Sequence, residues 1–152
     1  FPESGWDKVM DLNVKSLFFL TQKFAPLLRA SATAERPAKV INMASVDGIH
    51  NARPETYSYS ASKAAVIHLT RRMAKRLVEE HIHVNAIAPG AFASNMNVWA
   101  RDNPGEVTQR IPARRIGRPD DMAGTAIFIS SRAGDYLVGI TIPVDGGVAF
   151  AN

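Results

Sequence analysis

Three short apolar runs, separated by stretches with helical periodicity, are the feature that most constrains the fold of this chain. Runs of this length and character are typical of strands that are covered on both faces. Strands that alternate with helices predict an α/β fold with a parallel sheet and right-handed crossovers. The apolar runs cover 38–44, 82–87 and 138–144, and the helical patterns cover 4–29, 57–80 and about 119–131.

The candidate site is expected where these strands end. In open parallel sheets, ligands bind outside the carboxyl ends of the strands. Ser45 follows the first apolar run, with Gly48 breaking the strand pattern shortly afterwards, and Pro89-Gly90 follows the second run. These residues are therefore predicted to lie at one edge of the sheet.

The region 91–115 has weak periodicity and contains scattered Asn, Pro and Gly residues. Excursions of this length in compact domains are usually functional lids or disordered segments. Because few of its residues look like apolar anchors, we expect this region to be mobile when no ligand is bound.

Tyr59 and Lys63 are four positions apart in the helical pattern 57–80. This spacing stacks both side chains on one face of a helix, a turn apart. A free phenol has a pKa of about 10, too high for a base near neutral pH, and a nearby ammonium group favours the phenolate. The pair therefore indicates a proton donor and acceptor, although the spacing alone also fits a surface tyrosine beside a solvated lysine. Tyr57 is the rival phenol, but its fourth neighbour is Ala61.

Length and composition exclude several classes of protein. The 152 residues are enough for one ordinary domain, and 46% hydrophobic and 21% charged residues describe a globular chain rather than a disordered one. No apolar run approaches the roughly 18 residues of a membrane span, and the start of the chain has no signal-peptide pattern. The absence of cysteine excludes disulfides and fits a cytoplasmic protein.

The net charge of +4 does not indicate a nucleic-acid partner. The basic residues are scattered, and no aromatic residues interleave with them as a stacking platform requires. The four histidines lack carboxylate partners at the spacing of a zinc site, so no metal is expected.

Six motifs stand along the chain in an order and spacing that together are specific. They are Asp-Leu-Asn-Val at 11–14, Ile-Asn-Met-Ala-Ser at 41–45, Tyr-Ser-Ala-Ser-Lys at 59–63, Val-Asn-Ala-Ile-Ala-Pro-Gly at 84–90, Gly-Arg-Pro at 117–119 and Val-Asp-Gly-Gly at 144–147. On these motifs the chain resembles the carboxyl-terminal part of a short-chain dehydrogenase/reductase. Within that family it is most similar to 3-oxoacyl-carrier-protein reductases and gluconate dehydrogenases.

The resemblance implies a Rossmann-like, doubly wound parallel sheet, of which 1–152 would be the carboxyl-terminal catalytic part of a single domain. It also implies an oxidoreductase that uses NAD or NADP to interconvert a ketone and a secondary alcohol, and that forms a homodimer or tetramer. The family's phosphate loop, Gly-x-x-x-Gly-x-Gly, does not occur in this chain, which begins with Phe1. We therefore expect a longer natural protein, and doubtful activity for this chain by itself.

The resemblance assigns four catalytic residues. Tyr59 would be the general acid/base, and Lys63 would favour its phenolate and hold the nicotinamide ribose. Ser45 would hydrogen-bond the substrate oxygen, and Asn13 would anchor a water that connects Lys63 to solvent. The residues implied to bind the cofactor are Tyr59, Lys63, Pro89, Gly90, Phe92 and Ser94.

A second interpretation is a catalytically inactive chain that acts as an oligomerisation or binding module. The family uses the helices that correspond to 4–29 and 57–80 for dimerisation, so partner binding could persist without catalysis. Detecting NAD(P)H binding would separate the two interpretations.

Overall fold

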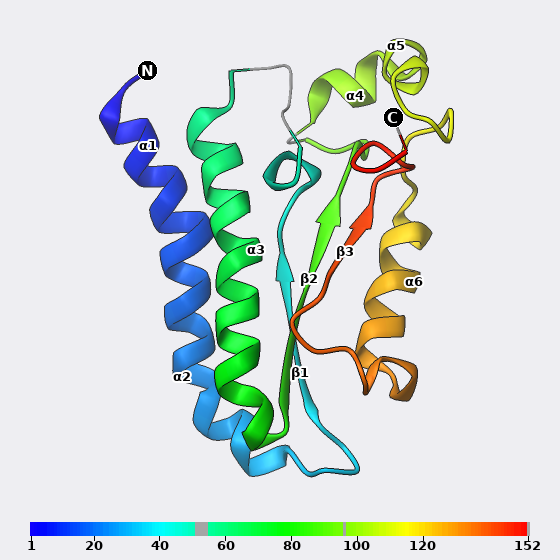
Figure 1. Cartoon of the computed structure of the whole chain (residues 1–152). Helices are drawn as coiled ribbons and strands as arrows, with labels where there is room; N and C mark the ends of the chain where they lie inside the picture. The colour runs from blue at the N-terminus through cyan, green and yellow to red at the C-terminus, as the bar shows by residue number, and fades with distance from the viewer. Residues whose placement is uncertain (51–54, 96, 152) are drawn as a thin grey trace.

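The sheet in the computed structural model contains three parallel strands in the order β1–β2–β3 (Figure 1). The structure describes residues 1–50, 55–95 and 97–151. In the register, Ala38 pairs with Ile82 and Ala86 pairs with Thr141. The α/β fold with a parallel sheet is therefore confirmed. The strands are β1 (Ala38–Met43), β2 (Ile82–Pro89) and β3 (Thr141–Val144).

Helices cover both faces of this sheet (Figure 1). On one face, α1, a π-helical segment and α2 form one continuous helical path that lies along α3, and α3 packs on β1 and β2. On the opposite face, α6 packs against all three strands. The bounds are α1 (Glu3–Met10), the π-helix (Asp11–Lys15), α2 (Ser16–Ser31), α3 (Tyr57–Leu77) and α6 (Pro119–Ser130).

The main core lies between α3 and the first two strands. Because side chains alternate along a strand, every second residue of β2 faces α3. The buried side chains of this interface form two clusters: Ala44, Val66, Ile67, Ala86 and Ala88, and then Met73, Ala74, Leu77, Ile82 and Val84. One buried polar pair joins the two layers, since Asn42 Nδ2 donates a hydrogen bond of 2.9 Å to Thr70 Oγ1. Among the helices of the described residues, none has the length and apolar character needed to cross a bilayer.

The region 91–115 is better anchored than its sequence indicates. It contains α4 (Val98–Asp102) and α5 (Pro104–Gln109). Ala100, Val107 and Ile111 are buried in a cluster of their own, against which Val148 from the end of the chain packs. The expectation of few apolar anchors was wrong because three residues of the region itself, spaced over two short helices and the turn after them, pack together. The mobility of this region stays a prediction.

The third strand is shorter than the apolar run 138–144 predicts. Asn85, which is fully buried in β2, donates through Nδ2 to Leu137 O (2.8 Å) and accepts at Oδ1 from Ile140 N (3.0 Å). Gly139, with φ of +74°, donates to Val84 O at 2.9 Å. An asparagine side chain therefore satisfies this backbone in place of a regular ladder.

One edge of the sheet is open within the described part of the chain, where β1 pairs with β2 alone. A groove of about 540 Å³ runs between this strand and α2. Its lining includes the apolar side chains of Leu12, Leu20 and Phe24, which are 68%, 59% and 50% exposed. An unpaired strand edge beside exposed apolar side chains is a template for association with another chain segment.

Candidate active site

Tyr59 and Lys63 lie in the first two turns of α3, next to the carboxyl end of β1. Lys63 Nζ donates a hydrogen bond of 2.9 Å to the backbone oxygen of Met43, the last residue of that strand. The same nitrogen lies 5.5 Å from the centroid of the Tyr59 ring, which is within the range of a cation–π contact. The helix and the strand end thus hold the ammonium group beside the phenol ring.

The ammonium group of Lys63 is partly removed from water. Burial lowers the pKa of Lys63 from its ordinary value of 10.5, because desolvation disfavours the charged form. An ammonium carries three N–H donors, and Met43 O accepts one of them. This donor set fits a group that presents two hydroxyls, such as the ribose of a nicotinamide nucleotide.

Asn13 is hydrogen-bonded to α3 at a residue that lies between Tyr59 and Lys63 in the sequence. It lies in the π-helical segment, and such segments are frequent at functional sites. Asn13 Nδ2 donates to Ser62 Oγ (2.9 Å), and the fully buried Ser62 donates in turn to Tyr59 O (2.7 Å). Ser62 was not singled out from the sequence, because a partner 49 residues away leaves no periodic signal.

Ser45 is buried immediately beyond β1. Its Oγ accepts a hydrogen bond of 3.2 Å from Asp47 N and so caps the short 3₁₀ turn Val46–Gly48. Burial raises the pKa of the Asp47 carboxyl group, and His50 opposes that rise. The turn packs against α3, which places Ser45 on an element in contact with the helix that carries Tyr59.

The rival phenol points elsewhere. Tyr57 is 58% exposed, and its hydroxyl donates to Glu55 Oε1 at 3.3 Å. Its ring packs edge to face on Phe1, with 6.4 Å between the centroids. Of these two tyrosines, Tyr59 is therefore the one beside the lysine.

Three of the residues predicted to contact a cofactor, Pro89, Gly90 and Ser94, lie at the end of β2 or in the loop after it. Pro89 ends β2, and Gly90 N donates to Val144 O at 3.0 Å. A Cβ on Gly90 would lie 2.7 Å from the Cα of Asp145, so glycine is needed where the ends of β2 and β3 meet. Ser94 is exposed, and its Oγ accepts from Asn97 N at 3.1 Å, just before α4.

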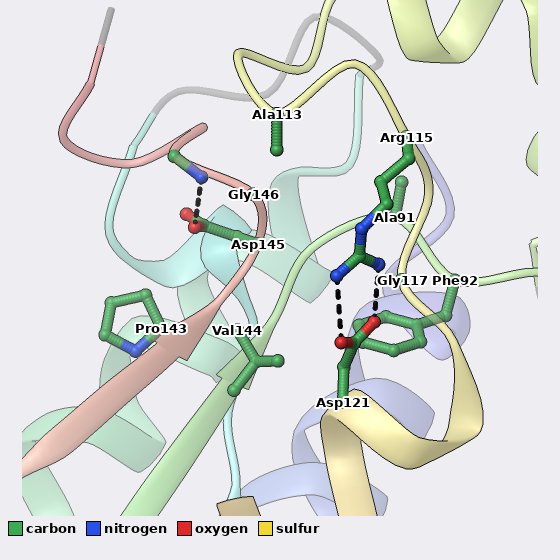
Figure 2. A pocket seen from close by; sticks show the side chains of 11 residues that line it. Ala91, Phe92, Ala113, Arg115, Gly117, Asp121, Pro143, Val144, Asp145 and Gly146 are labelled. Carbon is green, nitrogen blue, oxygen red and sulfur yellow. Dashed lines mark hydrogen bonds and ion pairs between the residues drawn. The ribbon is translucent and has the colours of Figure 1, made fainter.

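Phe92 lines a second pocket, of about 290 Å³, between the segment 113–121 and the end of β3 (Figure 2). Its ring packs directly on Gly117, where a Cβ would lie only 2.3 Å away. Arg115 and Asp121 form a two-pronged ion pair in this pocket, with N–O distances of 2.6 and 2.9 Å. This pair lowers the pKa of Asp121 to about 2.

The charged groups of this second pocket are engaged with their own surroundings. Asp145 accepts hydrogen bonds from the backbone nitrogens of Gly147 (2.9 Å) and Ala149 (2.7 Å). Gly146 and Gly147 have positive φ, which favours glycine. We interpret 145–147 as a turn that holds the last residues of the chain against the segment 111–115. Ala113 N donates a hydrogen bond of 2.9 Å to Gly146 O.

Comparison with known proteins gives consistent results along nearly the whole chain. The family model described as enoyl-(acyl carrier protein) reductase matches residues 1–149. A rhamnolipids biosynthesis 3-oxoacyl-[acyl-carrier-protein] reductase from Pseudomonas aeruginosa is 49% identical over 150 residues, which are 97% of this chain and 59% of that protein. A 2-dehydro-3-deoxy-D-gluconate 5-dehydrogenase from Dickeya dadantii is 43% identical over 97% of this chain and 58% of that protein.

A solved structure described as the Pseudomonas aeruginosa RhlG/NADP active-site complex superposes with a TM-score of 0.94 at 49% identity. The match covers 98% of this chain and 59% of that one. The chain therefore spans about three-fifths of the length of the relatives that it matches.

Proposed function

Because the chain belongs to the short-chain dehydrogenase/reductase family, we propose that it forms the proton-transfer part of an NAD(P)-dependent oxidoreductase. The reaction is the interconversion of a ketone and a secondary alcohol. The observation that carries this proposal is the half-buried ammonium of Lys63, which bonds Met43 O and lies 5.5 Å from the Tyr59 ring centroid at the carboxyl end of β1. We place residues 1–152 in a single Rossmann-like domain, as its carboxyl-terminal part.

In the direction of reduction, Tyr59 donates the proton. Its O–H bond breaks as a new O–H bond forms on the substrate oxygen, and the phenolate that remains is stabilised by the positive charge of Lys63. Ser45 donates a hydrogen bond to the same substrate oxygen, which favours the charge that develops there. In oxidation the same residues act in reverse, with Tyr59 as the base.

A bound reduced nicotinamide dinucleotide would supply the hydride, with its electron pair, for the new C–H bond at the carbonyl carbon. Lys63 would hold the ribose of that dinucleotide with the N–H donors that Met43 O does not use. A helix N-terminus behind a glycine-rich loop would hold the pyrophosphate, but the Gly-x-x-x-Gly-x-Gly motif does not occur in this sequence. The residues of this chain therefore fit the nicotinamide half of the cofactor.

Asn13 would anchor a water that connects Lys63 to solvent, through which the proton is replaced. Its side-chain amide nitrogen donates one hydrogen bond, to Ser62 Oγ at 2.9 Å, which fixes the side chain beside α3. We assign Pro89, Gly90 and Ser94 to the nicotinamide side of the cofactor because Pro89 ends β2 and the other two follow it along the chain.

The substrate class follows from the relatives. One is named as a 3-oxoacyl-[acyl-carrier-protein] reductase and another as a gluconate-type dehydrogenase. We therefore propose a 3-oxoacyl thioester as the substrate, with a keto sugar acid as the competing candidate. The choice between NAD and NADP is open, although one related structure holds NADP.

The test is an assay of the longest natural chain that carries residues 1–152, followed through the absorbance of the reduced nicotinamide. We expect turnover on the order of 1–10³ s⁻¹ with at least one of the two substrate classes and with NADH or NADPH. Absence of turnover with both substrates and both cofactors, in a folded protein, would contradict the proposed activity.

The second candidate function is self-association. Exposed apolar side chains on the π-helix and α2 favour it, because Leu12, Phe19 and Leu27 are 68%, 54% and 66% exposed. We propose a homodimer or tetramer that uses α1, α2 and α3. We also propose a cytoplasmic location, which the cysteine-free composition fits. The helices would serve association whether or not the chain is active.

We expect the isolated 152-residue chain to associate or exchange strands, and to bind no dinucleotide at micromolar concentration. The unpaired edge of β1 favours association, and the chain lacks the phosphate-loop motif. Calorimetric titration with NADH and NADPH, combined with sedimentation, measures both properties. The longest natural chain is the positive control, and micromolar binding by a well-folded 152-residue monomer would contradict this expectation.

A further inference from the structure

We propose that Gly48 is a positioning residue, which sets the separation between Ser45 and the helix that carries Tyr59 and Lys63. This inference rests on the proposed function, because Ser45 and Tyr59 must reach the same substrate oxygen. Gly48 touches no reacting atom. It acts through the distance between the turn Val46–Gly48 and α3.

The contact between Gly48 and α3 is made by backbone atoms. A Cβ on Gly48 would lie 2.6 Å from the carbonyl carbon of Lys63, 2.8 Å from its oxygen and 2.7 Å from Ala64 N. Backbone atoms of a helix interior cannot rotate away as the end of a side chain can. Gly48 is not in the left-handed region, so glycine is required here for space and not for backbone conformation.

The turn transmits this contact to Ser45. Gly48 N donates to Ser45 O at 3.0 Å, and Asp47 N donates to Ser45 Oγ at 3.2 Å. After the turn, Ile49 packs on the core cluster that contains Val66 and Ile67 of α3. Ser45, the turn and the helix therefore form one packed unit, in which a displacement at Gly48 displaces Ser45.

A methyl group at position 48 would force the turn and α3 apart. Contacts between non-bonded carbon atoms are optimal at about 3.5–4.0 Å, so a contact of 2.6 Å requires a shift approaching 1 Å. A misplacement of about 1 Å in a catalytic site can cost about 10²-fold in rate. Lys63 is also bonded to Met43 O, which opposes movement of the helix, so we expect the displacement to fall mainly on the turn and on Ser45.

The test is a double-mutant cycle in the longest natural chain. We expect Gly48→Ala to lower kcat by about 10–100-fold, while the dissociation constant of NADPH changes by less than about twofold. In a Ser45→Ala background, the same substitution should lower kcat by less than about threefold, because coupled residues are non-additive. Gly124→Ala is the matched control, since a Cβ there meets nothing within 4 Å, and its kcat should equal that of the parent.

Equal losses from Gly48→Ala in both backgrounds, or no loss in the parent, would overturn the positioning role. If Ser45→Ala itself retained full turnover, the proposed function of Ser45 would fail instead. Circular dichroism and thermal melting verify that each variant is folded. If Gly48→Ala does not fold, Ile49→Val loosens the same turn without a clash, and its loss of kcat should likewise disappear in the Ser45→Ala background. Additive losses there would overturn the inference.

Discussion

Replacing Tyr59 with phenylalanine in the longest natural chain should lower kcat by about 10²–10⁴-fold, the usual contribution of general acid–base catalysis. Only the hydroxyl is removed. The ring that lies 5.5 Å from Lys63 Nζ remains, so the lysine keeps its neighbour and the dissociation constant for NADPH should change by less than about twofold. The measurement is steady-state turnover together with cofactor titration of the same preparation.

Tyr57→Phe is the matched control, because it removes a phenol hydroxyl two residues earlier on the same helix. That hydroxyl is bonded to Glu55 in an exposed position, so kcat should equal that of the parent. A Tyr59→Phe variant that kept more than a tenth of its turnover, or a Tyr57→Phe variant that lost most of it, would show that the wrong phenol has been assigned.

The arrangement of strands and helices could be predicted because it depends on local patterns. The run 38–44 became β1, and the pattern 57–80 became α3 followed by a 3₁₀ turn. The π-helical segment at Asp11–Lys15 could not be predicted, since one additional residue in a turn barely changes the apolar periodicity. The buried cluster of the 91–115 region could not be predicted because its residues lie on two short helices and the turn after them, which share no single periodicity.

The candidate site could be predicted only where its residues are neighbours in one element. Tyr59 and Lys63 are paired by helical geometry alone. The contacts that hold them are tertiary: Met43 O lies 20 residues from Lys63, and Asn13 lies 49 residues from Ser62. Gly48 was visible as a break in a strand pattern, but its reason, the backbone of α3 at 2.6 Å, exists only in the folded chain.

The structure also places two of the predicted cofactor-binding residues beside different cavities. The ring of Phe92 packs on Gly117 in the pocket that contains the Arg115–Asp121 pair (Figure 2). Lys63 instead borders the groove between α2 and β1. Phe92 and Lys63 therefore border different cavities, and that difference cannot be read from a motif.

Replacing Lys63 with methionine should impair both cofactor binding and turnover, because two roles are assigned to one ammonium group. Hydrogen bonds to charged groups contribute about 1.5–3 kcal/mol each, so loss of the ribose contacts should weaken NADPH binding by about 10–100-fold. Without the positive charge the phenolate of Tyr59 is less favoured, and kcat should fall by about 10²-fold or more. Titration and steady-state kinetics measure the two losses separately.

The Lys63→Met substitution should change the stability of the fold in the opposite sense to the change in activity. Burial lowers the pKa of Lys63 in the folded chain below its ordinary value of 10.5. At a pH between the folded-state pKa and 10.5, the unfolded chain therefore binds more protons than the folded one. The free energy of unfolding of the parent therefore gains a contribution as the pH rises through that window, and the charged lysine is a cost at neutral pH. The Lys63→Met variant should lack this gain and should melt at or above the temperature of the parent at pH 7.

Lys75→Met is the control, because Lys75 is an exposed lysine three turns further along α3. It should leave NADPH binding and kcat unchanged. Unaltered cofactor affinity in Lys63→Met would refute the ribose contact while leaving the charge role intact. A large drop in melting temperature would instead show that the bond from Lys63 to Met43 O stabilises the fold by more than desolvation costs it, and that the lysine is structural before it is catalytic.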